Sequence, residues 1–264
     1  FIYDSHYRKE NEERVAEELD YLGKRYKTKY FTFSDEAISP NAFDRMSKAI
    51  LSQGVEMRAL GMLKFESDSI ETVELFKNMY KAGFLMLFFG LESANDRILS
   101  IIEKGCDQAT EKRVLENSSL AGIWNHLYLF FGFPTEEKHE AQETIDFTVQ
   151  HSELGDGTIH SVGQSVFSLE KDSAIYHDPA KFQINRILRD PERDMAIIFD
   201  YEIEKGMTKD EVLDVYENFD KTIESNFPSR KTWNYLSREH FLLYLDHYGR
   251  EEILNMTRPL VQST

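Results

Sequence analysis

Three short polar clusters in this sequence each come directly after an apolar run, and their residue types could bind a small molecule. The first contains Asp35 and Glu36, the second Glu92 and Ser93, and the third Glu136. Carboxylates in such positions can accept hydrogen bonds from an ammonium group or a ribose. A single acidic residue after a strand is often only the N-cap of the next helix. Three clusters in succession favour a ligand site.

Small and aromatic residues accompany these clusters. Gly90 and Gly132 would let the backbone approach a flat ligand closely. Phe130, Phe131 and Phe133 could cover an aromatic base, because their rings supply a large apolar area. His126, His160, Tyr128, Gln164 and Ser168 are further candidates for the inner wall of a barrel, although buried histidines more often serve packing alone.

The elements that must position these residues follow a repeated order of helix, glycine and apolar run. Gly54, Gly83 and Gly122 each end an amphipathic helical pattern, as glycine does in the left-handed conformation. Strands that alternate with helices predict a parallel sheet, in which ligands bind at the carboxyl ends of the strands. Five strands are expected, near 29–34, 55–63, 84–91, 125–133 and 158–168.

The pattern changes after about residue 170, where prolines interrupt the chain and helical patterns dominate. We therefore expect a barrel-like domain over 1–175 and a mostly helical C-terminal extension over 176–264. The net charge of −16 disfavours nucleic acid and membrane headgroups as partners, and no apolar run is long enough to span a bilayer. Cytoplasm is the expected compartment. Because the first residue is Phe1, we also expect a segment upstream.

The order and spacing of the motifs resemble the radical SAM superfamily, and most closely the group that often carries an upstream cobalamin-binding domain. The matching segments are Phe-x-Phe-x-Asp-Glu at 31–36, Phe-Gly-Leu-Glu-Ser at 89–93, Lys104-Gly105, and Phe-Gly-Phe-Pro-Thr-Glu at 131–136. The resemblance covers roughly residues 8–180. It implies an α/β fold, a partial (β/α)6 TIM-like barrel that here lacks its first strand.

The same resemblance implies a chemistry. A CxxxCxxC loop after the first strand holds a 4Fe-4S cluster, which reduces S-adenosylmethionine (SAM) to a 5′-deoxyadenosyl radical. The family would then require SAM, the cluster, an electron donor and a small-molecule or peptide substrate, with cobalamin in an upstream domain of some members. Cys106 is the one cysteine of this chain, so the cluster cysteines are expected upstream of Phe1 and the chain as given should be inactive.

The resemblance also assigns cofactor-binding roles to individual residues. Asp35 and Glu36 would contact the methionine ammonium, and Glu92 and Ser93 the ribose or the methionine carboxylate. Lys104 could pair with that carboxylate. The segment Gly132-Phe133-Pro134 would lie near the adenine, with Thr135 standing where the family usually has glycine.

Two other hypotheses remain open at this stage. The chain could be a cluster-less relative that binds SAM, a nucleoside or a protein partner without radical chemistry. Alternatively, an unrelated barrel enzyme could hold a divalent metal through Asp35, Glu36 and Glu92, since carboxylates suit magnesium or manganese. The substrate and the reaction type cannot be deduced from this sequence, because one barrel fold serves many reactions.

Overall fold

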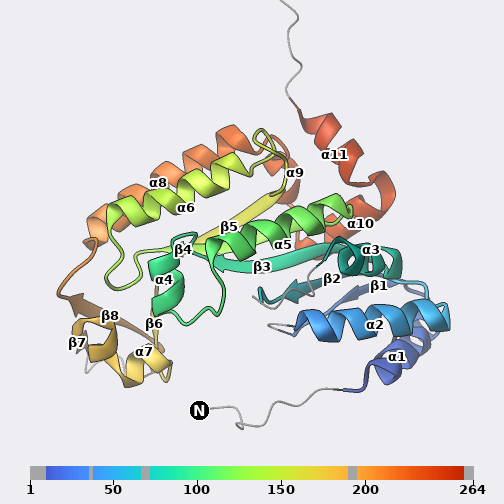
Figure 1. The fold of residues 1–264 in the computed structure, drawn as a ribbon, viewed down its shortest axis with the longest axis horizontal. Coiled ribbons are helices and arrows are strands. Elements are labelled where there is room, and N and C mark those ends of the chain that lie inside the picture. The colour runs from blue at the N-terminus through green and yellow to red at the C-terminus, as the bar shows by residue number, and fades with distance from the viewer. Residues whose placement is uncertain (1–9, 36–37, 67–71, 190–194, 259–264) are drawn as a thin grey trace, which may run out of the picture.

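The computed structural model describes residues 10–35, 38–66, 72–189 and 195–258. Its main sheet has five parallel strands in the order β1-β2-β3-β4-β5, which curve into a half-barrel (Figure 1). The strands are β1 Tyr30–Thr32, β2 Arg58–Leu63, β3 Phe84–Glu92, β4 Trp124–Phe131 and β5 Ser161–Val166. All five expected strands are therefore confirmed, in sequence order.

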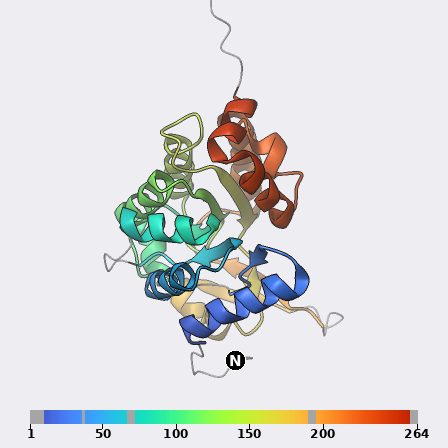
Figure 2. The ribbon, with the colours of Figure 1, turned by 90° about the vertical axis from the view of Figure 1, so that its right-hand side faces the viewer.

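Helices connect and cover these strands. They are α1 Glu12–Tyr26, α2 Pro40–Gln53, α3 Val73–Ala82, α4 Asp96–Ile101, α5 Gln108–Leu120 and α6 Lys138–Gln150. Gly54 and Gly83 end α2 and α3 in the left-handed conformation, as the sequence predicts. Figure 2 shows α3 and α5 on one side of the sheet and the C-terminal helices on the other.

The strands are rich in phenylalanine because they are covered on both faces. Phe84, Phe88, Phe89 and Phe131 are almost fully buried. Phe84 packs edge-on against Phe43 of α2, with ring centroids 5.1 Å apart. Burial of each such ring contributes roughly 2–3 kcal/mol to stability. The continuous apolar runs of the sequence thus correspond to a sheet buried on both faces.

The C-terminal part is more mixed than expected. It contains α8 Lys209–Asn226, α9 Arg230–Trp233, α10 Arg238–Tyr248 and α11 Arg250–Thr257. Before them come α7 Ala174–His177, a 3-10 turn at Pro179–Phe182, and a small antiparallel sheet, β6-β8-β7. Its strands are β6 Leu169–Glu170, β7 Ile184–Leu188 and β8 Ile198–Ile203.

The small sheet is the main feature that the sequence analysis missed. Exposed and half-buried residues alternate along β8, which is the period-2 pattern of a strand with one solvated face. The prolines near positions 179 and 191 indicate breaks in the chain, and breaks on either side of so short a segment do not predict a strand. β6 lies before the predicted boundary at 175 but pairs with β8 beyond it, so the small sheet joins the two predicted regions. The boundary itself stays a prediction.

The extension also attaches to the first two strands of the half-barrel. Asp246 of α10 accepts hydrogen bonds from Lys29 Nζ at 2.8 Å, Tyr30 Oη at 2.9 Å and Arg58 Nε at 2.5 Å. Partial burial acts to raise the pKa of Asp246, but these three donors outweigh it and lower the pKa to about 2. Phe241 of the same helix packs on Trp124 of β4. Helix α10 thus lies against the sheet through both charge and apolar contact.

Candidate functional site

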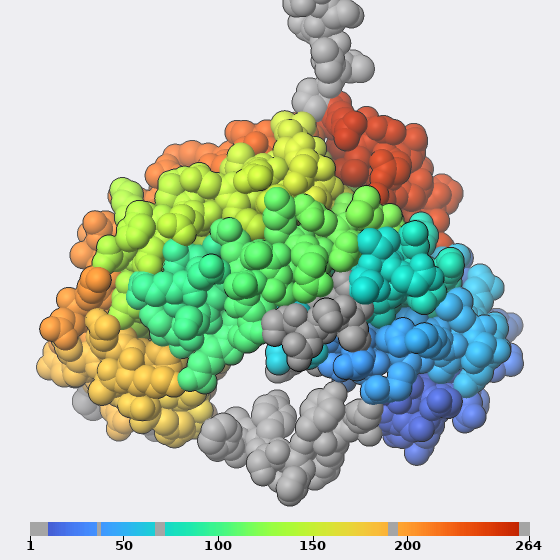
Figure 3. Space-filling model, in the orientation of Figure 1, coloured from blue at the N-terminus to red at the C-terminus, as the bar shows by residue number. Residues whose placement is uncertain are grey.

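The predicted site residues lie along one edge of the sheet, because parallel strands all end at the same edge. β3 and β4 are neighbours, and their register pairs Glu92 with Leu129, three residues before Gly132. Asp35 follows β1, two strands away from β3, and is exposed. Glu36 lies outside the described residues. Figure 3 shows that the surface is hollowed between the small sheet in gold, α4–α5 in green and α2 in blue (Figure 3).

The ion pair of Glu92 and Lys104 is the most defined polar feature of this edge. Lys104 Nζ lies 3.1 Å from Glu92 Oε1, and both side chains are partly buried. Glu92 has a φ of +63° at a register irregularity between β3 and β4. A Cβ at Gly90 would lie 2.5 Å from Glu92 Oε1 and 3.0 Å from Lys104 Nζ. Glycine at position 90 therefore lets this ion pair lie directly over the strand backbone.

Glu111 lies close to this pair and was missed by the sequence analysis. It is fully buried in the first turn of α5, where an acidic residue reads as an ordinary helix-dipole partner. One carboxyl oxygen accepts a hydrogen bond from Cys106 Sγ at 3.9 Å, and the other has no hydrogen-bond partner within the described part of the chain. Burial raises the pKa of Glu111 well above its usual value, against the opposing effect of Lys104. Burial therefore favours the neutral form of the Glu111 carboxyl, and Glu92 is the ion-pair partner of Lys104.

Ser93 does not accompany Glu92. Its hydroxyl is buried against α6, 3.1 Å from Thr144 Oγ1, and accepts a hydrogen bond from the backbone amide of Asn95. Ser93 follows the last residue of β3, Glu92, whose left-handed backbone turns the chain at this point. The structure thus places Ser93 in the packing between the end of β3 and α6, and a cofactor contact for it stays a prediction.

The turn after β4 is held by both parts of the chain. Gly132 has a φ of +82°, and its amide donates to Glu136 Oε2 at 2.6 Å. The Tyr201 hydroxyl of β8 donates to the Gly132 carbonyl at 3.4 Å, and a Cβ at Gly132 would lie 2.7 Å from Val212 of α8. Burial raises the pKa of Glu136 to about 7, although the Gly132 amide opposes this. The C-terminal extension therefore shapes the segment that was expected beside the adenine.

Phe133 and Pro134 follow in this turn and are both buried. Phe133 packs against Phe130 and Phe167, at centroid distances of 6.1 Å and 5.1 Å. Phe131 instead packs against Phe219 of α8, so the three phenylalanines do not form one surface, and a contact of Phe130 or Phe133 with an aromatic base stays a prediction.

Arg97, which is exposed, and Glu140, which is buried, form a second ion pair that the sequence did not reveal. The Arg97 guanidinium bonds both Glu140 oxygens and also donates to the Thr135 carbonyl at 2.8 Å and hydroxyl at 3.1 Å. Thr135 has a φ of +77°, which is a strained conformation for a β-branched residue. The two Arg97 contacts hold Thr135 in this conformation.

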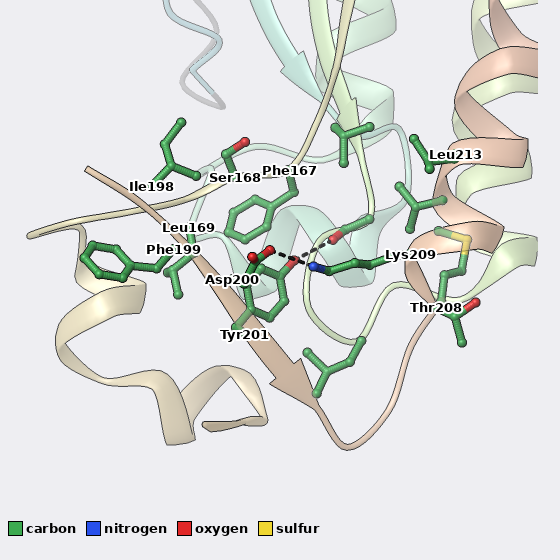
Figure 4. A pocket seen from close by; sticks show the side chains of 15 residues that line it. Phe167, Ser168, Leu169, Ile198, Phe199, Asp200, Tyr201, Thr208, Lys209 and Leu213 are labelled. Carbon is green, nitrogen blue, oxygen red and sulfur yellow. Dashed lines mark hydrogen bonds and ion pairs between the residues drawn. The ribbon is translucent and has the colours of Figure 1, made fainter. Parts of the chain in front are cut away.

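A cavity of about 410 Å³ lies between the Gly132 turn, strand β8 and the start of helix α8. Figure 4 shows Phe167, Leu169, Tyr201 and Leu213 around it, with the ion pair of Asp200 and Lys209 at one side (Figure 4). Lys209 Nζ lies 2.6 Å from Asp200 Oδ1. The charged groups of this cavity thus bond one another, and the walls of the cavity are largely apolar.

Glu92 and Lys104 suit the amino-acid end of a ligand that carries both an ammonium and a carboxylate. Glu92 could receive the ammonium and Lys104 the carboxylate, so that each side chain exchanges its present partner for an equivalent one. They do not suit an iron–sulfur cluster, because Cys106 is the one thiol of the chain. Within the described residues no three His, Cys, Asp or Glu side chains are grouped as metal ligands, so the metal hypothesis gains no support there.

The half-barrel, with its polar strand ends and short helical connections, defines an α/β-barrel protein, a class in which ligands bind at the carboxyl ends of the strands. A family model described as the radical SAM superfamily matches residues 2–148. The chain therefore belongs to the radical SAM superfamily. Over the described residues no helix is both long and apolar enough to cross a membrane.

Individual relatives agree with this family. The chain is 30% identical over 138 residues to the uncharacterized methyltransferase PH0819 of Pyrococcus horikoshii, covering 51% of this chain and 29% of that protein. The cobalamin-dependent SAM radical enzyme OxsB has a similar structure, with a TM-score of 0.63, 14% identity, and coverage of 94% of this chain and 42% of that one. The radical SAM methyltransferase TsrM of Kitasatospora setae gives a TM-score of 0.55, 14% identity, and coverage of 95% and 55%.

The two structural likenesses concern the fold alone, since both identities are low. The chain spans less than a third of the curated relative and about half or less of the two structures.

Proposed function

We propose that this chain is the SAM-binding core of a radical SAM enzyme that, as an intact protein, cleaves SAM reductively to a 5′-deoxyadenosyl radical. The observation that carries the proposal is the Glu92–Lys104 ion pair over Gly90, beside the Gly132 turn. An electron donor, a cytoplasmic location and an upstream segment with the cluster cysteines belong to the same proposal.

Each residue of this edge has a definite part in binding. Glu92 and Lys104 orient the amino and carboxylate groups of the methionine end, and Asp35 adds a second acceptor at the far end of the edge. The Gly132 turn offers backbone and aromatic surface to the adenine, with Phe133 and Pro134 behind it. Bound SAM supplies the carbon–sulfur bond that is broken. The protein positions it and excludes water around it.

Methyl transfer is the reaction class that we would test first. The curated relative and TsrM are both named methyltransferases, and OxsB and TsrM are both described with cobalamin. Cobalamin binding in an upstream domain of the intact protein is part of this proposal. Methyl transfer is tested by assaying S-adenosylhomocysteine and 5′-deoxyadenosine as separate products.

A titration of SAM into this chain, followed by calorimetry, tests the binding site. We expect Lys104→Gln to weaken SAM binding about tenfold, because it removes one charge-assisted contact worth roughly 1.4 kcal/mol. Lys48→Gln is the matched control, since Lys48 forms a surface ion pair with Asp44 on α2. Lys48→Gln should bind SAM as tightly as the wild type. If Lys104→Gln binds SAM equally tightly, the assignment of this edge is wrong.

The cluster-less alternative is favoured by one observation, the single cysteine of the chain. It predicts SAM or nucleoside binding without any release of 5′-deoxyadenosine. Anaerobic cluster reconstitution of the full-length protein, followed by a 5′-deoxyadenosine assay with a reductant, separates the two. Release of the product supports the radical enzyme, and SAM binding without release supports the alternative.

A further inference from the structure

A second cavity, of about 460 Å³, lies between strands β3–β5 and the segment that joins α9 to α10. Parallel pairing sets Phe88 beside His126 and Gly90 beside Tyr128 and Gly163. Paired residues share a face of a sheet, so the rings of β3 and β4 point to the same side. Asn125, which alternates with them, bonds instead to the Leu115 carbonyl of helix α5. The cavity thus lies on the inner face of the half-barrel, away from α5.

The floor of this cavity is aromatic. The rings of Phe88 and Tyr128 are stacked at 5.7 Å with an interplanar angle of 12°, and His126 lies edge-on to Tyr128 at 4.7 Å. Trp233 of α9 stands edge-on to His126 at 6.3 Å. A Cβ at Gly163 would lie 2.9 Å from the Tyr128 ring, so glycine there leaves room for the ring to lie flat on the sheet. Such a floor suits a flat apolar group.

His126 and Tyr128 direct unused hydrogen-bonding groups toward this cavity. His126 Nδ1 lies 2.7 Å from Ser161 Oγ, and Ser161 Oγ accepts a hydrogen bond from Trp124 Nε1 at 2.7 Å, so in either tautomer of His126 the Nε2 atom remains for a ligand. Burial and the nearby Arg238 lower the pKa of His126 to about 3, and the ring is neutral near pH 7. Among the described residues, the Tyr128 hydroxyl has no hydrogen-bond partner.

Arg238 supplies the positive charge of the cavity. Its guanidinium lies 5.8 Å from the centre of the Phe88 ring, and its Nε is 3.3 Å from the carboxylate of the adjacent Glu239. Its two terminal nitrogens bond no other described residue, and both side chains are about half exposed. An arginine whose two terminal nitrogens bond no other described residue offers the paired donors that a carboxylate prefers.

We propose that this cavity binds a flat aromatic group that carries a carboxylate. The ring lies on Tyr128, which the buried ring of Phe88 supports from below, the carboxylate pairs with the terminal nitrogens of Arg238, and a polar atom of the ring bonds His126 Nε2 or the Tyr128 hydroxyl. The paired terminal donors of Arg238 select the carboxylate, against the opposing charge of Glu239 and the net charge of −16 of the chain. The reading of this cavity as the substrate subsite rests on the proposed function, whereas ligand binding itself does not.

The test uses 3-phenylpropionate as the probe, with the chain free of SAM and cluster. Trp233 lines the cavity, so its fluorescence reports binding, and Trp233→Phe assigns the signal. We expect a Kd of about 1 mM or tighter, as befits a fragment of this size. The amide and the amine analogues of the probe should bind at least fivefold more weakly than the acid.

Arg238→Gln is the decisive variant, because Arg238 is half exposed and its loss should leave the fold intact. It should weaken 3-phenylpropionate about tenfold and leave the amide unchanged. Arg186→Gln is the matched control, since Arg186 is an exposed arginine paired with Glu202 in the small sheet. Tyr128→Phe should weaken a probe with a ring hydroxyl more than 3-phenylpropionate itself.

The proposal is overturned if the acid, amide and amine bind equally, if none binds, or if Arg238→Gln and Arg186→Gln behave alike. A parallel titration with SAM keeps the two proposals apart. Probe binding that depends on Arg238, in a chain that fails to bind SAM, would support this cavity and refute the proposed function. The reverse result would refute the cavity alone.

Discussion

At the scale of single residues, the buried carboxyl groups are the most informative feature. Glu111 and Glu136 are both almost fully buried, and each has one oxygen without a hydrogen-bond partner among the described residues. Burying a charged carboxylate in this way would be costly, so both groups favour the neutral form. Each lies behind a part of the proposed SAM-binding edge, Glu111 behind Lys104 and Glu136 behind Gly132.

Glu136 should make stability depend on pH. Its pKa is about 7 in the folded protein and about 4.3 in the unfolded chain. Between these values the folded state binds more protons, so the free energy of unfolding falls as pH rises, by about 4 kcal/mol in total. Glu136→Gln keeps an acceptor for the Gly132 amide and cannot ionise. We expect it to be about 1–3 kcal/mol more stable than the wild type at pH 8 and nearly equal at pH 5.

Urea unfolding of both proteins at the two pH values measures this difference. Glu153 also has a pKa of about 7, raised by burial, but it is present in both proteins and cancels in the comparison. An equal effect of Glu136→Gln at pH 5 and pH 8 would show that the charge of Glu136 is not the cause.

At the scale of elements, the glycines between helix and strand decide how closely the layers pack. Gly83 and Gly54 both end a helix with positive φ, of +109° and +66°. A Cβ at Gly83 would lie 2.1 Å from the Met57 carbonyl oxygen, whereas none of the surrounding atoms lies within 4 Å of a Cβ at Gly54. Gly83 therefore serves both the turn and the close approach of β2 to β3, and Gly54 serves the turn alone.

Substitution by alanine should separate these two roles. Gly54→Ala should cost about 1 kcal/mol, the usual penalty of a left-handed alanine. Gly83→Ala should cost about 3 kcal/mol or more, because the backbone at Met57 must move as well. Thermal and urea unfolding of the two variants give the comparison. Equal losses would mean that the α3–β3 junction can shift freely.

At the scale of the whole molecule, the C-terminal extension completes the half-barrel rather than hanging from it. Its helix α10 lies on β1, β2 and β3, and its strand β8 and helix α8 hold the Gly132 turn. The same extension supplies Arg238 and Trp233 to the inner cavity. Ligand binding at either place should therefore depend on residues that lie far from the family motifs in sequence.

Asp246 tests this attachment. Its pKa of about 2 lies below the value of about 3.9 in an unfolded chain, so it contributes stability above pH 4 that is lost as pH falls toward 2. Asp246→Asn should lower the free energy of unfolding by about 2 kcal/mol at pH 7, and by less at pH 3. Thermal unfolding at both values measures this.

The control for Asp246 is Asp214→Asn, at an exposed position of α8. It should change the melting temperature little at either pH. Limited proteolysis should cut the Asp246→Asn variant faster within the extension. If the two variants melt alike, the contacts of Lys29, Tyr30 and Arg58 with Asp246 add nothing to stability.

The amino-acid sequence alone determined the five strands, their parallel order and the polar strand ends. Apolar runs, helix-ending glycines and motif order are local signals, and they can be recognised in the sequence without knowing any tertiary contact. Glu92, Lys104 and Gly132 were found in this way, and the structure brings the first two into contact at the edge where Gly132 also lies.

Only the tertiary structure decided which side chains face one another. It turned Ser93 into the packing against Thr144, joined Arg97 to Glu140 across 43 residues of sequence, and buried Glu111 beside Lys104. It also folded β7 and β8 into a small sheet and placed Arg238 over Phe88. Burial and long-range contact depend on how elements pack in three dimensions, and no local spacing in the sequence encodes that packing directly.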